Sequence, residues 1–437
     1  MAPARITPST AIFGSYSRLT ARLLYAAASI RRFFARRPRR RGPIDRNLIR
    51  SIVLIRLDEM GDFVIFSSVL RSLRQSFPQA RITLVLCDWI RPLAELCPYV
   101  DEVVPFPSRG PKWWQFILGP FRALKIAMRL HGPFDLAVNP RFDRDIRGAA
   151  FLADFSLAPW VAGYPSSTEP FKAMVNRGYD RFYTHLLPSG RYAAGQTTNN
   201  DGLPRGMHEL ERSRAILTLL GIPVEDIRPE LWISPIDRQE ADAILRMHGW
   251  RPGDVLICLG INASYARKRW PMDCFVQLAR SLAVLPDSRF LIVGSRRERE
   301  NAELLRPVLG SRLINLAGQS ALRVSAAILA ACRLYVGNDS GPKHLAAALG
   351  KPVIEISCHP RDGDPAHFQS PERFGPLAEP AILLSPRTAL TPCSSTCLAD
   401  EPHCIRQISP EEVLDAVCEM MRKTCPSGAV SLATGHE

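Results

Sequence analysis

Short apolar runs alternate with longer stretches of helical spacing along most of this chain. Four runs rich in Val, Ile and Leu lie between residues 51 and 139, and five more lie between residues 255 and 357. Continuous apolar runs of about four to eight residues are typical of strands buried on both faces of a parallel sheet, with the intervening helices covering those faces. The pattern therefore predicts an α/β fold with two doubly wound units.

The expected strands and helices alternate in both units. The strands are predicted at Ser51–Arg56, 81–86, 102–105 and 135–139 in the first unit, and at 255–259, 290–293, Leu313–Asn315, 334–336 and 352–357 in the second. The predicted helices include 62–76, 272–285, 321–331 and 410–422. Ligands of such sheets bind beyond the carboxyl ends of the strands, so two units that face each other predict a central cleft.

Proline and glycine cluster between residues 222 and 253, which places the boundary between the units there. The predicted organisation is an N-terminal extension, two Rossmann-like domains and a flexible tail, at 1–48, 49–235, 236–423 and 424–437. The stretch 188–206 is rich in Gly, Asn, Thr and Pro and has no periodicity. It is expected to be a surface loop that touches substrate.

The basic charge is concentrated at one end of the chain. The 437 residues carry a formal charge of +14, but the first 50 hold 12 Arg and one acidic residue and so account for +11. A nucleic-acid binder needs a basic face on its folded domain, so the nearly neutral remainder argues against nucleic acid as a partner.

No apolar run reaches the roughly 18 to 20 residues of a membrane span. The 11 cysteines, without a secretion signal, indicate a reducing compartment.

Within the basic segment, apolar residues recur in steps of three and four. They are Ile12, Tyr16, Leu19, Leu23, Ala26 or Ala27, Ile30 and Phe34. Such a stripe predicts an amphipathic helix that lies on an anionic membrane surface, with the arginines of 36–41 as a polybasic patch, so that residues 12–41 contact the membrane. The alternatives are a disordered basic leader, an organelle transit peptide and a start codon assigned too early.

The first candidate motif joins the first predicted strand to its helix. It runs from Arg56 through Gly61 to Asp62, and predicts a glycine turn followed by a carboxylate at a helix start. Asp62 is therefore a candidate for chemistry at the mouth of the cleft. The alternative is that Asp62 only caps the helix by accepting backbone N–H groups.

Three strand ends of the second unit share features of a phosphate site. Residues 336–344 run from strand to helix and contain Asp339, Ser340 and Gly341, which are suited to hold an anion at the helix N-terminus. Residues 262–271 contain three adjacent cations, and residues 294–298 contain two more. Asp339 as a helix cap and the basic stretches as solvated loops are the alternatives.

Together these motifs resemble glycosyltransferase family 9, which holds the bacterial ADP-heptose:lipopolysaccharide heptosyltransferases. The resemblance covers about residues 50–422 and rests on three ordered segments: Ile55-Arg56 with Met60-Gly61-Asp62, then Lys268-Arg269-Trp270-Pro271, then 338–348, Asn-Asp-Ser-Gly-Pro-Lys-His-Leu-Ala-Ala-Ala. It implies the GT-B architecture, in which two Rossmann-like domains face a cleft, the N-terminal one binds acceptor and the C-terminal one binds the nucleotide sugar.

The resemblance also implies roles for individual residues. Asp62 matches the general base, with Arg56 and Gly61 beside it as acceptor or loop candidates, and Lys268 matches the lysine that neutralises the departing diphosphate. The residues implied in donor binding are Asn262, Ser264, Lys268, Glu298, Asp339, Ser340, Gly341 and His344. Of these, Glu298 would take the ribose diol, Asp339 sugar hydroxyls, and Ser340 and Gly341 the phosphates.

The implied activity is inverting transfer of heptose or a related sugar from an ADP-sugar to a lipopolysaccharide-core or other lipid-linked acceptor. No cofactor is required, and the expected place is the cytoplasmic face of the bacterial inner membrane, where the enzyme is peripheral. Two alternatives stay open: a protein or capsule acceptor, and a non-catalytic membrane-associated scaffold on the same fold. Residues 357–360 and 370–376 depart from the common family turn, which leaves heptose less certain than ADP-sugar transfer.

Five cysteines gather after residue 392. Cys393, Cys397 and Cys404, with His403 adjacent and Cys358 as a further candidate, are soft ligands suited to Zn or Fe. The spacing lacks the C-x₂-C pair of a zinc ribbon, so reduced thiols without metal are the alternative. Some relatives implied by the resemblance bind iron through cysteines.

Overall fold

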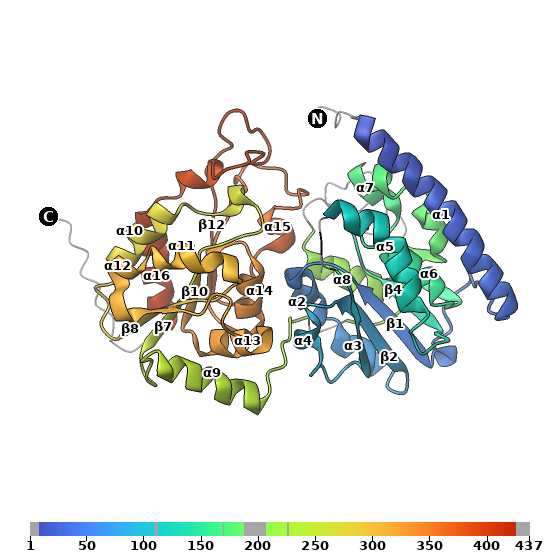
Figure 1. Cartoon of the computed structure of the whole chain (residues 1–437), viewed down its shortest axis with the longest axis horizontal. Helices are drawn as coiled ribbons and strands as arrows, with labels where there is room; N and C mark the ends of the chain where they lie inside the picture. The colour runs from blue at the N-terminus through green and yellow to red at the C-terminus, as the bar shows by residue number, and fades with distance from the viewer. Residues whose placement is uncertain are drawn as a thin grey trace. The chain divides into compact units, whose positions relative to one another are not determined.

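The computed structural model describes residues 8–108, 110, 112–168, 170–187, 207–224 and 227–424. The chain divides into two compact units, Met1–Ile227 and Arg228–Glu437. Each unit contains a six-stranded sheet with covering helices (Figure 1). The predicted loop 188–206 and the predicted tail beyond residue 424 lie outside the described residues.

The sheet of the first unit is parallel throughout, with the order β3-β2-β1-β4-β5-β6. Its strands are β1 (Ser51–Arg56), β2 (Arg81–Cys87), β3 (Glu102–Phe106), β4 (Leu136–Asn139), β5 (Trp160–Gly163) and β6 (His185–Leu186). The four predicted strands are confirmed. The sequence pattern missed β5 and β6, which have four and two residues.

The helices of the first unit differ from the prediction after β1. They are α1 (Pro8–Phe34), α2 (Met60–Ser67), α3 (Leu70–Ser76), α4 (Arg91–Ala94), α5 (Lys112–Ala127), α6 (Ala149–Phe155), α7 (Pro170–Val175) and α8 (Glu209–Leu219). The single helix predicted over 62–76 is wrong, since α2 and α3 replace it. The hydroxyls of Ser67 and Ser68 each donate, at 2.6 Å, to a backbone carbonyl three residues earlier. Such local bonds compete with the helical ladder.

The second unit repeats the same topology, with the order β12-β11-β10-β7-β8-β9 and parallel pairing throughout. Its strands are β7 (Val255–Gly260), β8 (Ser288–Ile292), β9 (Leu313–Asn315), β10 (Leu334–Asn338), β11 (Val353–Ile356) and β12 (Ala381–Leu384). The five predicted strands are confirmed, with ends shifted by up to two residues. The sequence pattern missed β12, an edge strand whose side chains are mostly exposed.

Helices cover the second sheet in two groups. They are α9 (Pro235–Met247), α10 (Met272–Leu282), α11 (Arg299–Glu303), α12 (Arg306–Leu309), α13 (Leu322–Ala331), α14 (Gly341–Ala348), α15 (Pro371–Phe374) and α16 (Pro410–Thr424). Helix α10 contacts α12 and α16, while α13 contacts α9 and α14. Trp270 and Phe275 pack edge to face at 4.9 Å within the core that α10 and α16 share with the sheet.

In both sheets, the first strand of the unit separates strands that the chain adds on one side from strands that it adds later on the other side. The chain moves outward from β1 to β3 and returns to place β4 on the other side of β1; β7 and β10 are related in the same way. Each of these points is a topological switch point, where the connecting loops separate to opposite faces and leave a crevice at the carboxyl edge. The fold therefore predicts ligand sites after β1 and β4, and after β7 and β10.

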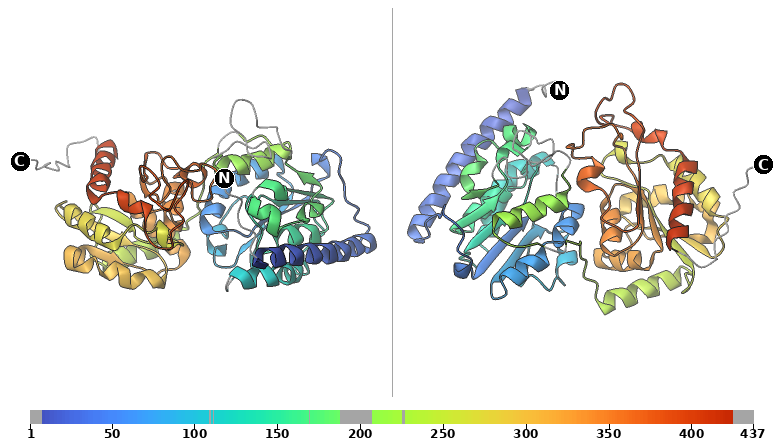
Figure 2. Two further views of the ribbon diagram at one scale, coloured as in Figure 1. Left: turned by 90° about the horizontal axis from the view of Figure 1, so that it is seen from above. Right: turned by 180° about the vertical axis from the view of Figure 1, so that it is seen from behind.

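Helix α1 packs along the first unit, against α6 and α7 (Figure 2). Its inner face contains Ala21, Ala28 and Arg32, which are buried. Arg32 Nη2 donates to Asp154 Oδ1 at 2.8 Å, and Arg39 Nη2 donates to the same oxygen at 2.5 Å. Asp154 is fully buried, and its carboxylate binds both Arg32 of α1 and Arg39, which follows α1. This ion-paired group is the junction between the N-terminal segment and the first unit.

The outer face of α1 is apolar and exposed. Leu19, Leu23, Ile30 and Phe34, which belong to the predicted apolar stripe, are 60 to 78% exposed. The side chains of the stripe before residue 18 lie outside the described part of the chain. The predicted polybasic patch is only partly available, because Arg37 and Arg39 of 36–41 are bound to the first unit. Among the described helices, none is both long enough and apolar enough to cross a membrane.

Substitution of Asp154 by alanine is expected to destabilise the first unit by about 3–5 kcal/mol, because it leaves two guanidinium groups without their counter-charge. Urea unfolding measures the change. Glu419→Ala, which removes the exposed ion pair of Glu419 with Lys423, is the control and should leave the unfolding midpoint nearly unchanged. Equal midpoints for Asp154→Ala and wild type would contradict this account of the junction.

Candidate active site

Arg56 connects the two strands at the switch point of the first unit. It is the last residue of β1 and is 2% exposed. Its Nη1 donates to the carbonyl of Pro140, directly after β4, at 3.1 Å, and its Nε lies 3.0 Å from Asp58 Oδ2. The predicted candidate Arg56 is thus a buried side chain at the carboxyl ends of β1 and β4.

Asp62 lies beside Arg56 in the first turn of α2. Its Oδ1 is 3.7 Å from Arg56 Nη2, and its Oδ2 accepts a hydrogen bond from the backbone N–H of Glu59 at 3.1 Å. Glu59 is the N-cap and Asp62 completes a capping box, so the carboxylate does have a structural role. The side chain nevertheless stays 21% exposed, which leaves it accessible to a substrate hydroxyl.

Burial raises the pKa of Asp62 to about 7, although the nearby Arg56 opposes the shift. A carboxylate with a pKa near the working pH is suited to accept a proton from an attacking hydroxyl. The predicted glycine turn before the helix is wrong, because Glu59 caps α2 and Gly61 lies inside the helix.

Two basic residues near the carboxyl end of β4 were not predicted: Arg141, in the connection after β4, and Lys172, in α7. Arg141 forms an ion pair with Asp58, and Lys172 Nζ donates to the carbonyl of Phe142 at 2.8 Å. Burial lowers the pKa of Lys172 to about 8 and that of Arg141 to about 10. The sequence signal for Arg141 was the charged stretch directly after the predicted strand 135–139, but its importance depends on β4 lying beside β1. Lys172 had no such signal.

In the second unit, Asp339 is the centre of a charged network after β10. Lys268 forms an ion pair with Asp339 Oδ2, and Lys343 Nζ lies 2.6 Å from Asp339 Oδ1. Lys343 also lies 2.9 Å from Glu355 Oε2 on β11. His344 Nε2 is 3.8 Å from the same Asp339 oxygen. Three motif residues, Lys268, Lys343 and His344, are therefore brought together around the Asp339 carboxylate.

The charges of this network fix the ionisation of Asp339. Burial disfavours its charged form, but the opposing charges of Lys268, Lys343 and His344 outweigh burial and hold the pKa of Asp339 well below its ordinary value. Sequence analysis did not single out Lys343 and Glu355, because a buried ion pair below a site has no sequence signature of its own.

The N-terminus of α14 lies next to the network. Ser340 is the N-cap, and its hydroxyl lies 3.1 Å from the hydroxyl of Tyr335 and makes no capping bond to the helix. Gly341 begins the helix. On β10, a Cβ on Gly337 would lie 2.4 Å from the carbonyl oxygen of Gly260 on β7, so only glycine permits the two strands to approach here.

Glu298 and Asn262 form a second polar group at the carboxyl ends of β7 and β8. Asn262 Nδ2 donates to Glu298 Oε1 at 2.7 Å, and the backbone N–H of Ser295 donates to Glu298 Oε2 at 2.9 Å. A Cβ on Gly294 would lie 1.5 Å from the Glu298 carboxylate. Ser264, on the same connection as Asn262, is exposed.

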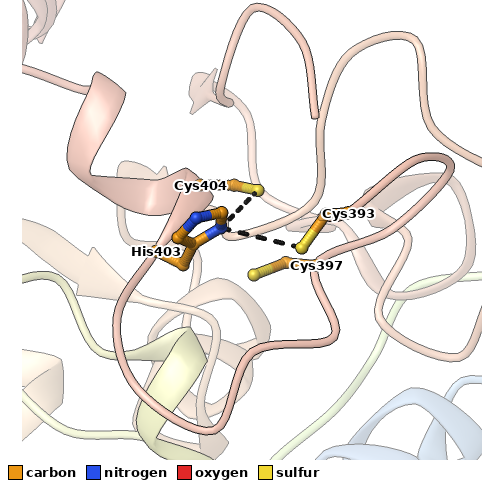
Figure 3. Close-up of side chains that lie close together, drawn as sticks. All are labelled: Cys393, Cys397, His403 and Cys404. Atoms are coloured by element: carbon orange, nitrogen blue, oxygen red, sulfur yellow. Dashed lines mark hydrogen bonds between the residues drawn. The ribbon is translucent and has the colours of Figure 1, made fainter. Parts of the chain in front are cut away.

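The cysteine candidates divide into two sets. The ligand atoms of Cys393, Cys397, His403 and Cys404 all lie within 4.8 Å of one another (Figure 3). Cys358 is not in this group; it packs in the main core of the second unit. The prediction of Cys358 as a further ligand is therefore wrong, because Cys358, two residues after β11, packs among the core side chains, whereas His403 lies with the three other cysteines.

The chain is similar to known glycosyltransferases in sequence and in fold. The family model "Glycosyltransferase family 9 (heptosyltransferase)" matches residues 175–393. Lipopolysaccharide heptosyltransferase 2 of Salmonella typhimurium is 28% identical over 316 residues, which cover 70% of this chain and 82% of the relative.

Two solved structures share the fold. The family 9 glycosyl transferase of Veillonella parvula superposes with a TM-score of 0.65 at 20% identity, over 86% of this chain and 97% of that one. The ADP-heptose lipopolysaccharide heptosyltransferase II of E. coli gives 0.61 at 20% identity, over 85% and 99%. With a family match over half of its length and this GT-B-like fold, the chain belongs to glycosyltransferase family 9 and is a glycosyltransferase.

Proposed function

We propose that this enzyme transfers heptose from an ADP-sugar to the core saccharide of lipopolysaccharide, with inversion at the anomeric carbon. The observation that carries the proposal is the Lys268–Asp339 pair beside the N-terminus of α14, at the switch point of the second sheet. A cation next to a helix N-terminus suits a diphosphate. The similarity to lipopolysaccharide heptosyltransferase 2 supports heptose and a core acceptor.

Asp62 is the general base of the proposed reaction. The acceptor oxygen forms a bond to the anomeric carbon as the bond from that carbon to the diphosphate oxygen breaks, and the hydroxyl proton passes to Asp62. Lys268 neutralises the negative charge that develops on the leaving diphosphate. One displacement inverts the centre, so the proposal needs neither a covalent intermediate nor a cofactor.

The remaining donor contacts follow from the two polar groups of the second unit. Glu298, oriented by Asn262, accepts hydrogen bonds from the ribose diol. The first amides of α14, at Ser340 and Gly341, bind the phosphates. Asp339 holds Lys268 in place and still has lone pairs for a sugar hydroxyl, since each carboxylate oxygen accepts two bonds.

The proposal is tested with purified full-length protein, ADP-heptose and two core acceptors, one without heptose and one that already carries one. We expect release of ADP and a product heavier by one heptose with one of these acceptors. Transfer only to a peptide or a capsule saccharide would contradict a lipopolysaccharide-core acceptor. It would favour the protein or capsule acceptor that the sequence left open. Membership in a glycosyltransferase family argues against the alternative that the chain is a non-catalytic scaffold.

We also propose that the outer face of α1 docks on the anionic cytoplasmic face of the inner membrane, where a lipid-linked acceptor is found. The exposed Leu19, Leu23, Ile30 and Phe34 would enter the acyl boundary, and Arg18 and Arg22 lie beside them, exposed. Because Arg32 and Arg39 anchor α1 to the first unit, binding would hold the folded enzyme and not only a tail.

The double substitution Leu23→Glu with Ile30→Glu is expected to weaken binding to phosphatidylglycerol vesicles at least about tenfold, because it removes two apolar contacts and adds repelled charge. Vesicle co-sedimentation measures the effect. The control is Ile236→Glu, which changes an apolar residue of α9 that is 73% exposed and should bind like wild type. Equal binding of all three proteins would refute the docking face. Deletion of residues 1–45 is a poorer test, since it also strips Asp154 of its partners.

A further inference from the structure

The group of Cys393, Cys397, His403 and Cys404 has the dimensions of a tetrahedral metal site. His403 Nδ1 lies 3.6 Å from Cys393 Sγ and 3.4 Å from Cys404 Sγ (Figure 3). Zinc bonds of about 2.3 Å to sulfur and about 2.0–2.1 Å to nitrogen, at tetrahedral angles, place such atoms about 3.6 Å apart. The two distances from the imidazole nitrogen to sulfur thus match those around a bound zinc ion, and all four ligand atoms lie within 4.8 Å of one another.

Backbone N–H groups donate to two of the sulfur atoms. Cys397 and Cys404 are fully buried and Cys393 is 9% exposed, and the three form a small cluster separate from the main core. The backbone N–H of Leu398 donates to Cys393 Sγ at 3.4 Å, and that of Leu390 donates to Cys404 Sγ at 3.5 Å. Backbone donors to sulfur are the outer-shell contacts that stabilise thiolate ligands. The cysteines are free thiols and form no disulfide.

The chain around the group has little regular secondary structure. Between β12 and α16 it contains one regular element, the short 3₁₀ helix η7 (Cys404–Gln407). A connection of this length without its own secondary structure usually has a function or a cross-link. Ala399, between two of the proposed ligands, accepts from Arg267 at 3.4 Å, and Ile408 accepts from Trp270 Nε1 at 2.9 Å. The connection therefore supports the segment that contains Lys268.

We infer that Cys393, Cys397, His403 and Cys404 bind one zinc ion, which serves as a structural cross-link of residues 385–409. Three thiolates and one imidazole fill a tetrahedral zinc site and leave no open position, which is typical of structural and not catalytic zinc. The inference goes beyond the proposed function, since zinc takes no part in the transfer step. Its only link to that function is the support that this connection gives to the segment around Lys268.

The first test is the metal content of full-length protein purified without a metal-affinity column. We expect about one zinc per chain in the wild type by plasma mass spectrometry, and less than about one-fifth in Cys397→Ser and Cys404→Ser. Cys418→Ser, a half-buried thiol of α16 outside the group, is the matched control and should keep its zinc. His403→Cys should also keep zinc, because four thiolates form an equivalent site. No zinc in the wild type, stoichiometric iron in its place, or full zinc in both ligand variants would overturn the inference.

Two measurements on the wild type do not depend on how the variants fold. Titration with a mercurial thiol reagent should release zinc in proportion to thiol modification, as detected by a chromogenic chelator. Removal of zinc should increase tryptic cleavage at Arg387 and Arg406, which lie within the cross-linked connection. Unchanged cleavage after zinc removal would refute the structural role. Neither measurement depends on transfer activity. If the proposed function fails, zinc release and tryptic cleavage would therefore still test the zinc site.

Discussion

Replacement of Asp62 by asparagine is expected to lower kcat about 10²–10⁴-fold while ADP binding stays within about twofold of wild type. The amide keeps the size of the side chain and can still accept a hydrogen bond from Glu59, but it cannot take the proton of the acceptor hydroxyl. ADP affinity should persist because the proposed donor residues all belong to the second unit. Steady-state kinetics and isothermal titration calorimetry measure the two quantities.

The chain offers a matched control for the capping role of this carboxylate. Asp237 closes the capping box of α9 with Ser234, as Asp62 does with Glu59. Asp237→Asn, which also weakens the ion pair of Asp237 with Arg323, should lose about 1 kcal/mol of stability and keep its turnover. If Asp62→Asn keeps wild-type turnover, or if both variants lose turnover equally, Asp62 is a cap and not the base.

The pH dependence gives an independent readout of the same residue. A general base acts in its ionised form, and the pKa of Asp62 is raised to about 7. The value of kcat/KM should therefore be level above pH 7 and fall about tenfold for each unit below it. A profile that stays level down to pH 5 would contradict Asp62 as the base.

Replacement of Lys268 by methionine is expected to lower kcat about 10²–10³-fold and to weaken ADP binding. Methionine keeps most of the side-chain volume but removes the cation that faces the departing diphosphate. Because Lys343 and His344 remain beside Asp339, the buried carboxylate keeps part of its counter-charge and the fold should persist. A thermal melt close to that of wild type would separate lost catalysis from lost structure.

Lys351→Met is the matched control, since this half-buried lysine precedes β11 at the opposite, amino edge of the same sheet. It should change kcat and ADP affinity by less than about twofold. Wild-type kinetics in Lys268→Met would exclude the lysine from the reaction. A rise in KM for the ADP-sugar with kcat unchanged would assign it to binding alone.

The sequence by itself predicted every strand of four residues or more except β5 and the exposed edge strand β12. It did so because a strand buried on both faces must be a continuous apolar run. It also predicted Asp62, Lys268, Asp339 and Glu298 as site candidates, since each follows a strand end within a recognisable motif. Their chemical roles remain proposals that the variants above would test.

Only the tertiary structure decided which of these groups meet. Strand order places β4 beside β1 and so brings Arg141 to the crevice of Arg56, although 84 residues separate the two strand ends joined by Arg56 and Pro140. Packing decided that Arg32 and Arg39 bind Asp154, while Arg36 and Arg41 stay exposed. Folding of an irregular connection brought His403, and not Cys358, to the cysteine group. The physical reason is the same in each case: a local pattern of apolar and polar residues determines which side of an element is buried, but contacts between distant charged or metal-ligating groups depend on which elements become neighbours.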